Sequence, residues 1–283
     1  MYDLTNIETI KRLLSGRDFS FSKALGQNFL IDPDVCPEMA RQSGIGEESG
    51  VLEIGPGVGV LTVELAKRAK KVAAAEVDAR LLPVLAKTLA DCPNTAVLNT
   101  DIMKTDLPEL CREQFADCAD VSVCANLPYY ITSPVIMLLL ECGVKFRTIT
   151  LMVQKEAAER ICAPVGGKNC GALTAAVHYC AGTEYLFDVG RESFLPPPSV
   201  DSAVIRLTPR ETPPVEVADE KTFFRVIKSA FAQRRKTAAN SLAAGMGKSK
   251  AEVIDILTGL GIPENARAET FTLETFAAIA GKF

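Results

Sequence analysis

The chain has 283 residues, of which 48% are hydrophobic and 23% charged, and its formal net charge at pH 7 is −4. This composition is typical of a packed protein with one large and one small domain, and it argues against a disordered chain. Residues 1–14 carry charges throughout, and the apolar run Val135–Leu140 is far too short to cross a membrane, so we expect a cytoplasmic protein without a membrane anchor.

The amino-terminal part predicts a short helix over Ile7–Leu14 and an extended lead-in to about residue 32. Gly50–Ile54 then reads as a short apolar strand, and it leads directly into the glycine-rich loop Gly55-Pro56-Gly57-Val58-Gly59. The apolar pattern of residues 60–66 predicts a helix after the loop. Such a strand–loop–helix unit lets a ligand approach the backbone closely and offers it unpaired N–H groups.

The next strand, Val72–Ala75, ends at Glu76, whose carboxylate can accept hydrogen bonds from both hydroxyls of a ribose. The glycine spacing argues against a dinucleotide, because Gly59 comes one residue too early for the pyrophosphate fingerprint. The negative charge of Glu53 also favours a cationic ligand over a pyrophosphate. S-adenosylmethionine is a common cofactor that combines a cation with a ribose. The alternative is a glycine-rich turn without a ligand.

Two further strand ends carry polar groups. Asp101 follows the strand-like run 96–100, and it can accept a hydrogen bond from an adenine amino group or simply cap a helix. Strand Asp120–Ala125 ends in Asn126-Leu127-Pro128-Tyr129-Tyr130. The carboxamide oxygen of Asn126 and a carbonyl left free beside Pro128 can both accept hydrogen bonds from one amino group. The ring of Tyr129 can hold the plane to which that amino group belongs. This pattern suits the exocyclic amine of a nucleobase. An ordinary Asn-Pro turn is the alternative.

Strands and helices alternate from Val51 to about Ala181, which predicts a largely parallel sheet covered on both faces. We expect strands near Glu184–Val189 and Ser202–Leu207 to complete it as an antiparallel pair, with Pro196–Pro198 at the active-site edge. Residues 209–214 read as a linker. Helices are expected over Thr222–Phe231, Lys236–Ala244, Lys250–Leu260 and Leu273–Ala280.

The cysteines and the single histidine do not indicate a metal site. None of the nine cysteines forms a Cys-x-x-Cys pair, so we interpret them as reduced, buried thiols. His178 falls in a helical pattern and is interpreted as structural.

Positive charge is concentrated although the whole chain is acidic. Between Lys221 and Lys250 there are eight Lys or Arg residues and no Asp or Glu, and Lys11, Arg12, Arg17 and Lys23 add to the amino-terminal side. Local basic stripes can neutralise phosphates on an acidic protein, although a solvated helix face gives the same pattern.

Taken together, these motifs resemble the small-subunit ribosomal RNA adenine-N6,N6-dimethyltransferases, a class I group that depends on S-adenosylmethionine. Five blocks spread over most of the chain carry the resemblance: Lys23–Leu30, Glu53–Gly57, Asn126–Ile131, Phe194–Ser202 and Phe231–Thr237. The sequence departs from the family at Ala172, where many relatives have a basic residue, so no RNA contact is expected there.

The resemblance implies a Rossmann-like catalytic domain over residues 1–209, with a mostly parallel seven-stranded sheet and a lead-in over 1–48, and a small helical RNA-contacting domain over 215–283. It implies these cofactor-binding residues: Asn28, Leu30, Gly55, Gly57, Glu76, Asp101 and Asn126. The catalytic residues it implies are Asn126, Pro128, Tyr129 and Phe194, with the two rings holding the target base. Arg234, Arg235 and Lys236 are the implied RNA-binding residues.

The activity implied is the double methylation of N6 on two adjacent adenosines near the 3′ end of small-subunit rRNA. The partner is this rRNA or a partly assembled small subunit, and the enzyme is expected to be a monomer without metal. Two alternatives stay open at this point. One is the related large-subunit rRNA methyltransferase group that confers macrolide resistance, and the other is a ribosome-assembly factor that has kept the fold without turnover.

Overall fold

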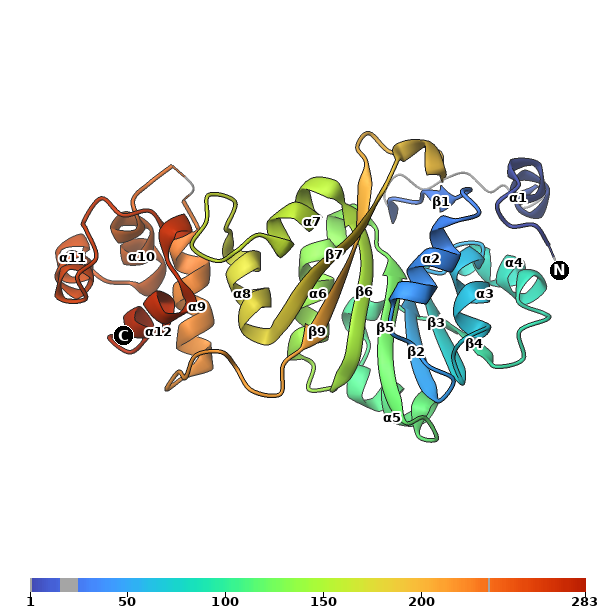
Figure 1. Ribbon diagram of the computed structural model, residues 1–283, viewed down its shortest axis with the longest axis horizontal. Helices are drawn as coiled ribbons and strands as arrows, with labels where there is room; N and C mark the ends of the chain where they lie inside the picture. Colours follow the sequence, from blue (N-terminus) through green and yellow to red (C-terminus); the bar gives the residue numbers. More distant parts are fainter. Residues whose placement is uncertain (1, 16–24, 234) are drawn as a thin grey trace. The chain divides into compact units, whose positions relative to one another are not determined.

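The computed structural model describes residues 2–15, 25–233 and 235–283 (Figure 1). The chain folds into two compact units, Met1–Ala158 with Glu184–Pro209 and Glu159–Thr183 with Arg210–Phe283. The second unit therefore consists of two separate stretches of sequence. The expected functional division into residues 1–209 and 215–283 places residues 159–183 with the first domain, whereas their packing groups them with the carboxy-terminal helices.

The first unit is built around a mostly parallel sheet, as predicted. Within the described residues it has seven strands in the order β4-β3-β2-β5-β6-β9-β7. Strands β4, β3, β2, β5 and β6 are parallel to one another, and β9 runs antiparallel to β6. The strands are β2 Ser49–Ile54, β3 Lys71–Glu76, β4 Thr95–Asn99, β5 Asp120–Asn126, β6 Phe146–Gln154, β7 Ala181–Val189 and β9 Ser202–Pro209.

Helices cover both faces of this sheet. Successive residues of a strand point to opposite sides, so one strand contacts helices on both faces. Val51 of β2 belongs to a buried cluster with residues of α2 and α3. The other side of β2 meets α5, since a Cβ atom added at Gly50 would lie 2.5 Å from Cδ1 of Phe115. The helices of this part of the chain are α1 Ile7–Leu14, α2 Val35–Gln42, α3 Val60–Ala66, α4 Leu82–Thr88, α5 Leu107–Phe115, α6 Thr132–Glu141 and α7 Lys155–Cys162.

A small second sheet joins the amino-terminal lead-in to the segment before the prolines, and no sequence pattern predicts it. Strand β1, Phe29–Leu30, pairs antiparallel with β8, Phe194–Leu195. Two further hydrogen bonds extend the pairing: the Ile31 N–H donates to the Ser193 carbonyl at 2.9 Å, and the Ser193 hydroxyl donates to Asp32 Oδ2 at 2.9 Å. These hydrogen bonds fix where Phe194 lies.

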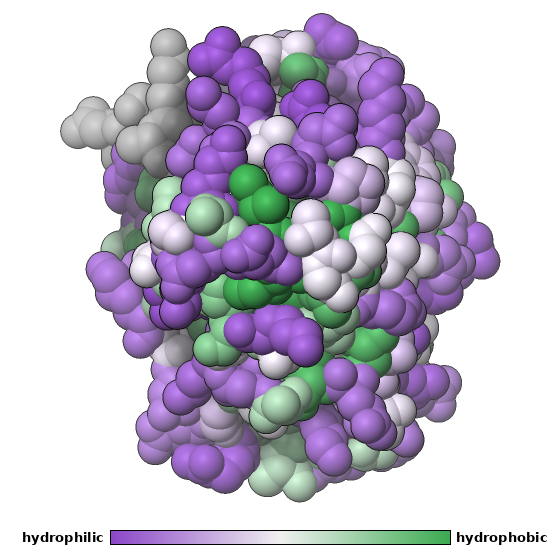
Figure 2. Space-filling view, turned by 90° about the vertical axis from the view of Figure 1, so that its left-hand side faces the viewer, coloured by the Kyte–Doolittle hydropathy of each residue, from purple (hydrophilic) through white to green (hydrophobic). Residues whose placement is uncertain are grey.

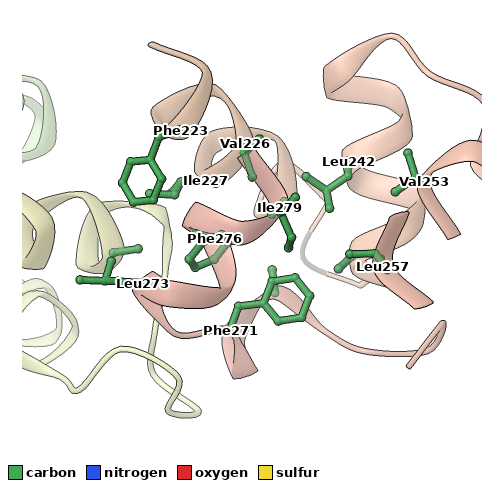
Figure 3. Packing of buried hydrophobic residues seen from close by; sticks show 14 of the residues in the cluster. Phe223, Val226, Ile227, Leu242, Val253, Leu257, Phe271, Leu273, Phe276 and Ile279 are labelled. Carbon is green, nitrogen blue, oxygen red and sulfur yellow. The ribbon is translucent and has the colours of Figure 1, made fainter. Parts of the chain in front are cut away.

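The second unit is helical, and its later helices fall close to where the sequence predicts them. They are α8 Ala172–Cys180, α9 Glu220–Ala230, α10 Ala238–Met246, α11 Lys250–Gly259 and α12 Leu273–Ala280. Helix α9 buries Phe223, Val226 and Ile227 on one face, at the spacing expected of an amphipathic helix. They point into a common apolar core with Phe276 and Ile279 of α12 (Figure 3).

The surface of the molecule on the side of α10 and α11 is largely hydrophilic, with a smaller group of apolar residues near its middle (Figure 2). Among the described residues, none of the helices is long and apolar enough to span a membrane.

Candidate active site

The residues proposed from separate motifs converge on one cavity of about 300 Å³ in the first unit. It lies at the carboxyl ends of the parallel strands β2, β3 and β5, the usual ligand-binding edge of such a sheet. The sequence-proposed residues that line it are Asn28, Leu30, Gly55, Gly57, Glu76, Asp101, Asn126, Pro128, Tyr129 and Phe194.

The glycine loop forms one wall, and its glycines serve different purposes. Gly55 has a φ of +71°, and a Cβ atom added there would meet nothing within 4 Å, so its backbone faces open space in the cavity. Gly57 has a φ of +60°, and an added Cβ would lie only 3.1 Å from Cδ1 of Phe29. Gly57 is therefore required by conformation and packing, while Gly55 leaves room where a ligand can touch the chain.

Glu76 is held at the end of β3 with its carboxylate on the cavity wall. Its Oε1 accepts from the Asp78 N–H at 2.8 Å, and its Oε2 accepts from the Gly57 N–H in a longer contact of 3.4 Å. Burial raises the pKa of this carboxyl, and the backbone hydrogen bonds oppose that rise. The side chain is thus oriented before any ligand binds, and each oxygen keeps a lone pair for a ligand hydroxyl.

Asp101 lines the cavity and also caps a short 3-10 helix, η3, Ile102–Lys104. Its Oδ1 accepts from the Met103 N–H at 3.1 Å, and its Oδ2 lies 3.3 Å from the Lys104 Nζ. The capping role, which was the alternative interpretation of this residue, is therefore present. Lys104 is largely exposed, so the ion pair with Asp101 is weak and can yield Oδ2 to a ligand donor.

Glu53 corrects an expectation, because it does not carry the negative charge that its place in the sequence suggested. Its side chain lines the cavity, only 1% of the residue is exposed, and burial raises its pKa to about 8. In the described part of the chain its Oε2 atom has no hydrogen-bond partner. Glu53 is therefore mainly protonated near neutral pH, and a cation bound next to it would favour its ionised form.

The turn after β5 holds the proposed catalytic groups. Asn126 is the last residue of β5, and its carboxamide forms no hydrogen bond with another described residue. The Pro128 carbonyl is not free as expected, because it accepts from the Ile131 N–H at 3.1 Å and so begins the 3-10 helix η4, Tyr129–Ile131. Only its second lone pair remains available for a ligand.

The two rings proposed to hold a base are supported differently. The Tyr129 hydroxyl hydrogen-bonds the Ser202 hydroxyl at 2.8 Å, which ties the ring to β9. Phe194 is only 2% exposed and packs in the buried cluster that contains Leu30. Its ring completes the cavity wall but offers little accessible surface in this structure. The proposed sandwich of a base between the two rings remains a prediction.

Gln27 and Tyr130 are among the cavity residues to which the sequence analysis gave no role. Gln27 donates from Nε2 to Asp78 Oδ2 at 2.8 Å, which links the lead-in to the end of β3. Tyr130 lines the cavity and is 59% exposed. Gln27 falls in a block already noticed for its resemblance, beside Asn28, which donates from Nδ2 to the Gly26 carbonyl at 3.3 Å. No pattern in a single sequence indicates that Tyr130 is exposed.

The basic segment of the second unit lies between α9 and α10. Arg235 and Lys236 are exposed there, whereas Arg234 lies outside the described residues, as do Arg17 and Lys23. Two other basic residues of the expected stripe have local partners: Arg225 donates to the Gly245 carbonyl at 3.2 Å, and Lys248 lies 3.6 Å from a Glu252 oxygen. The ion pair with Glu252 offsets the charge of Lys248, whereas the carbonyl bonded to Arg225 is neutral and leaves the charge of Arg225 available.

The cysteines form no disulfide within the described residues. Burial raises the pKa of Cys36, which lines the cavity, and of Cys124. In the part of the chain that the structure describes, no group of three or more His, Cys, Asp or Glu side chains could hold a metal ion. The His178 ring contacts the Ile161 carbonyl at 3.1 Å, which agrees with a structural role.

The strand order, the glycine loop after β2 and the carboxylate at the end of β3 define a Rossmann-like methyltransferase of class I. The family model for ribosomal RNA adenine dimethylase matches residues 18–281. The chain belongs to this family and is an S-adenosylmethionine-dependent rRNA adenine methyltransferase.

Individual relatives agree with this assignment. The ribosomal RNA small subunit methyltransferase A of Geobacillus thermodenitrificans (strain NG80-2) is 46% identical over 281 residues, which cover 98% of this chain and 96% of the relative. The crystal structure of a dimethyladenosine transferase from Plasmodium falciparum is 27% identical, with a TM-score of 0.71, and the match covers 89% of this chain and 95% of that one. The crystal structure of the 23S rRNA methyltransferase ErmE is 28% identical, with a TM-score of 0.67, and the match covers 90% and 99%.

Proposed function

We propose that this protein methylates N6 of two adjacent adenosines near the 3′ end of small-subunit rRNA, twice each, during ribosome biogenesis. The observation that carries the proposal is the convergence of Asn126 and Tyr129 with Gly55 and Glu76 on one cavity. The residues suited to the cofactor and the turn suited to an aromatic amine therefore line the same cavity. The protein acts in the cytoplasm as a monomer without metal.

The cavity residues fit S-adenosylmethionine, which supplies a methyl group on a sulfonium cation. The buried Glu53 carboxyl has an oxygen without a partner among the described residues, which suits a cationic ligand. The open backbone at Gly55 leaves room for the methionine part, and the oriented Glu76 carboxylate suits the ribose diol. Asp101 is placed to accept from the adenine amino group after releasing Lys104. The cofactor side of the wall is completed by Asn28, Leu30 and Gly57.

The catalytic work of the protein is to place and activate the adenine amine, whose lone pair is conjugated with the ring. The Asn126 carboxamide oxygen and the second lone pair of the Pro128 carbonyl accept the two amine protons, which favours a tetrahedral nitrogen. Correct alignment supplies most of the acceleration, since methyl transfer from a sulfonium is an in-line displacement. A strong general base is unnecessary, because the amine becomes acidic once methylated and then loses a proton to water.

The target base must leave its stack to reach this turn, at a cost of a few kcal/mol in a duplex. Stacking on the Tyr129 ring, which the hydrogen bond to Ser202 holds in place, offsets about 1–3 kcal/mol of that cost. Phe194 is the proposed second ring of the sandwich. Arg235 and Lys236, with Arg234 beside them in sequence, neutralise rRNA phosphates from the second unit.

The large-subunit alternative is less well supported. The chain is about as similar to the ErmE structure as to the Plasmodium falciparum enzyme, at 28% and 27% identity. The relative named for the small subunit is 46% identical over nearly the whole chain. The Phe194–Ser202 and Phe231–Thr237 blocks also favour the small subunit.

The test is incubation of the protein with radiolabelled S-adenosylmethionine and small ribosomal subunits that lack the modification, followed by nucleoside analysis. Dimethyladenosine is the expected product. Label in large subunits or in protein would overturn the substrate assignment. In parallel, Asn126→Ala should lose methyl incorporation while keeping subunit binding, whereas an assembly factor without turnover would show no incorporation in the wild-type protein either.

A further inference from the structure

Tyr130 is the most exposed large hydrophobic residue among those described, and it lies at the active cavity. It is 59% exposed, and two other exposed apolar residues line the same cavity, Val77 at 51% and Met103 at 38%. Exposing an aromatic ring to water gives up the favourable free energy of its burial. Tyr130, Val77 and Met103 together expose apolar surface at one ligand cavity, and such a group marks a surface that a ligand covers.

The backbone fixes this ring rather than leaving it on a free loop. Tyr130 sits in the middle of η4, which is closed by the hydrogen bond from the Ile131 N–H to the Pro128 carbonyl at 3.1 Å. Helix α6 continues directly from Thr132. The position of Tyr130 is thus set by the same turn that carries Asn126 and Tyr129.

One side of the ring is supported by the lead-in segment. A Cβ atom added at Gly26 would lie 3.5 Å from Cδ1 of Tyr130 and 3.4 Å from Cβ of Pro128. Gly26 has a φ of +60°, so a glycine suits both the conformation and the close approach. The ring therefore rests against the chain, and the rest of its surface is open.

The hydroxyl does not explain the position of the side chain. The Tyr129 hydroxyl is bonded to Ser202, whereas the Tyr130 hydroxyl forms no hydrogen bond with another described residue. The ring face is therefore the part of Tyr130 that is available for recognition. A nucleobase matches such a face, because every base has a π-surface and stacks on an aromatic side chain regardless of its identity.

We propose that Tyr130 is a stacking platform for the base next to the target adenosine, which rests on the proposed function. When one adenosine occupies the cavity at Asn126, its neighbour is one nucleotide away along the strand and must leave the stack on that side too. Tyr130 follows Tyr129 directly and is an exposed residue of the cavity lining, so it is within reach of the base next to one held at Tyr129.

The experiment compares Tyr130→Leu, Tyr130→Ala and Tyr130→Phe in methyl transfer to unmodified small subunits, with S-adenosylmethionine binding measured separately. Tyr130→Leu keeps an apolar group over Gly26 but removes the π-face, so it separates stacking from packing. We expect the KM for subunits to rise about 5- to 150-fold in the Leu and Ala variants, the equivalent of one base that no longer stacks. The KM of Tyr130→Phe should stay within about twofold of the wild-type value, because the hydroxyl forms no hydrogen bond with another residue that the structure describes.

The matched control is Tyr2→Ala, an exposed tyrosine outside the cavity, and its KM should not change. The proposal is overturned if Tyr130→Leu keeps the wild-type KM, if Tyr130→Phe loses as much as Tyr130→Ala, or if cofactor binding weakens in step with KM. Wild-type protein that transfers no label to small subunits would overturn the proposed function as well. A rise in KM confined to Tyr130→Leu and Tyr130→Ala supports both.

Discussion

A residue that suits ligand binding can lower the stability of the ligand-free protein, and Glu53 is the clearest case in this cavity. Its pKa lies near 8 instead of near 4.5 because the carboxyl is buried, so the folded protein holds a proton that the unfolded chain has already lost. Between about pH 4.5 and pH 8 the free energy of unfolding should therefore fall as the pH rises. The carboxyl that suits a cationic ligand thus destabilises the ligand-free fold.

We predict that Glu53→Gln stabilises the ligand-free protein increasingly as the pH rises from about 4.5 to about 8, and by a constant amount above that. Glutamine is neutral at every pH, so the variant lacks the part of the pH dependence that comes from the Glu53 carboxyl. The pKa of Glu76 is also raised, but Glu76 is present in both proteins and does not contribute to the difference between them. Thermal unfolding without cofactor across this pH range measures the effect. A difference in Tm that stays constant with pH would show that Glu53 does not titrate there.

The same substitution should weaken S-adenosylmethionine binding, in contrast to its effect on stability. A hydrogen bond to a charged group contributes about 1.5–3 kcal/mol, so we expect a Kd about 10- to 150-fold higher at about pH 8. Isothermal titration calorimetry measures it. Unchanged affinity for the cationic cofactor would rule out Glu53 as the partner of its charge.

Gly55 and Gly57 should respond differently to alanine although both have a positive φ. Either substitution costs about 1–2 kcal/mol of backbone strain. Gly57→Ala also brings a Cβ to 3.1 Å from the Phe29 ring, whereas Gly55→Ala points into open cavity space. We predict that Gly57→Ala lowers the Tm more than Gly55→Ala does. For a given drop in Tm, Gly55→Ala should cause the larger loss of cofactor affinity. Equal effects on both quantities would contradict the distinction.

At the scale of elements, the β1–β8 pair places Phe194 and Leu30 together. Ser193→Ala removes the hydroxyl that bonds Asp32, and we predict a loss of about 1 kcal/mol in stability with faster hydrogen exchange over residues 25–32. Hydrogen exchange with mass spectrometry provides the readout. Ser199→Ala, at an exposed serine of the same connection, is the control and should leave the exchange of this segment unchanged.

The elements also show how far prediction from the sequence reaches. Elements with their own periodicity or end signal were predicted, as in Ile7–Leu14 and Leu273–Ala280, whereas no range was predicted for strand β6 or helix α2. The β1–β8 pair was not, because two-residue strands have no measurable period and pair segments far apart in sequence. The polar site residues at strand ends were predicted from their position, whereas Asn28, Leu30 and Phe194 came from the family resemblance. The proton on Glu53 and the exposed face of Tyr130 depend on burial, which a single sequence does not reveal.

At the scale of the whole molecule, an acidic protein must hold an anionic substrate. Arg235→Ala with Lys236→Ala should weaken subunit binding and lower the slope of log affinity against log salt by about one for each phosphate that is no longer neutralised. Binding measured at several salt concentrations tests this. The control is Lys248→Ala, whose charge is shared with Glu252. Cofactor affinity should stay the same in all variants, and an unchanged salt slope would exclude this segment from RNA binding.

The split course of the second unit limits how its role can be studied by deletion. Helix α8 precedes the last sheet strands in sequence, yet its Tyr179 ring lies 4.6 Å from Phe223 of α9, and its hydroxyl donates to Glu220 at 3.0 Å. A protein cut after Pro209 would keep α8 but lose the helices that cover it, leaving Tyr179 and Ala175 uncovered. Inactivity of such a truncated protein would then report aggregation or misfolding, so point substitutions on the intact chain are the sound way to assign RNA contacts.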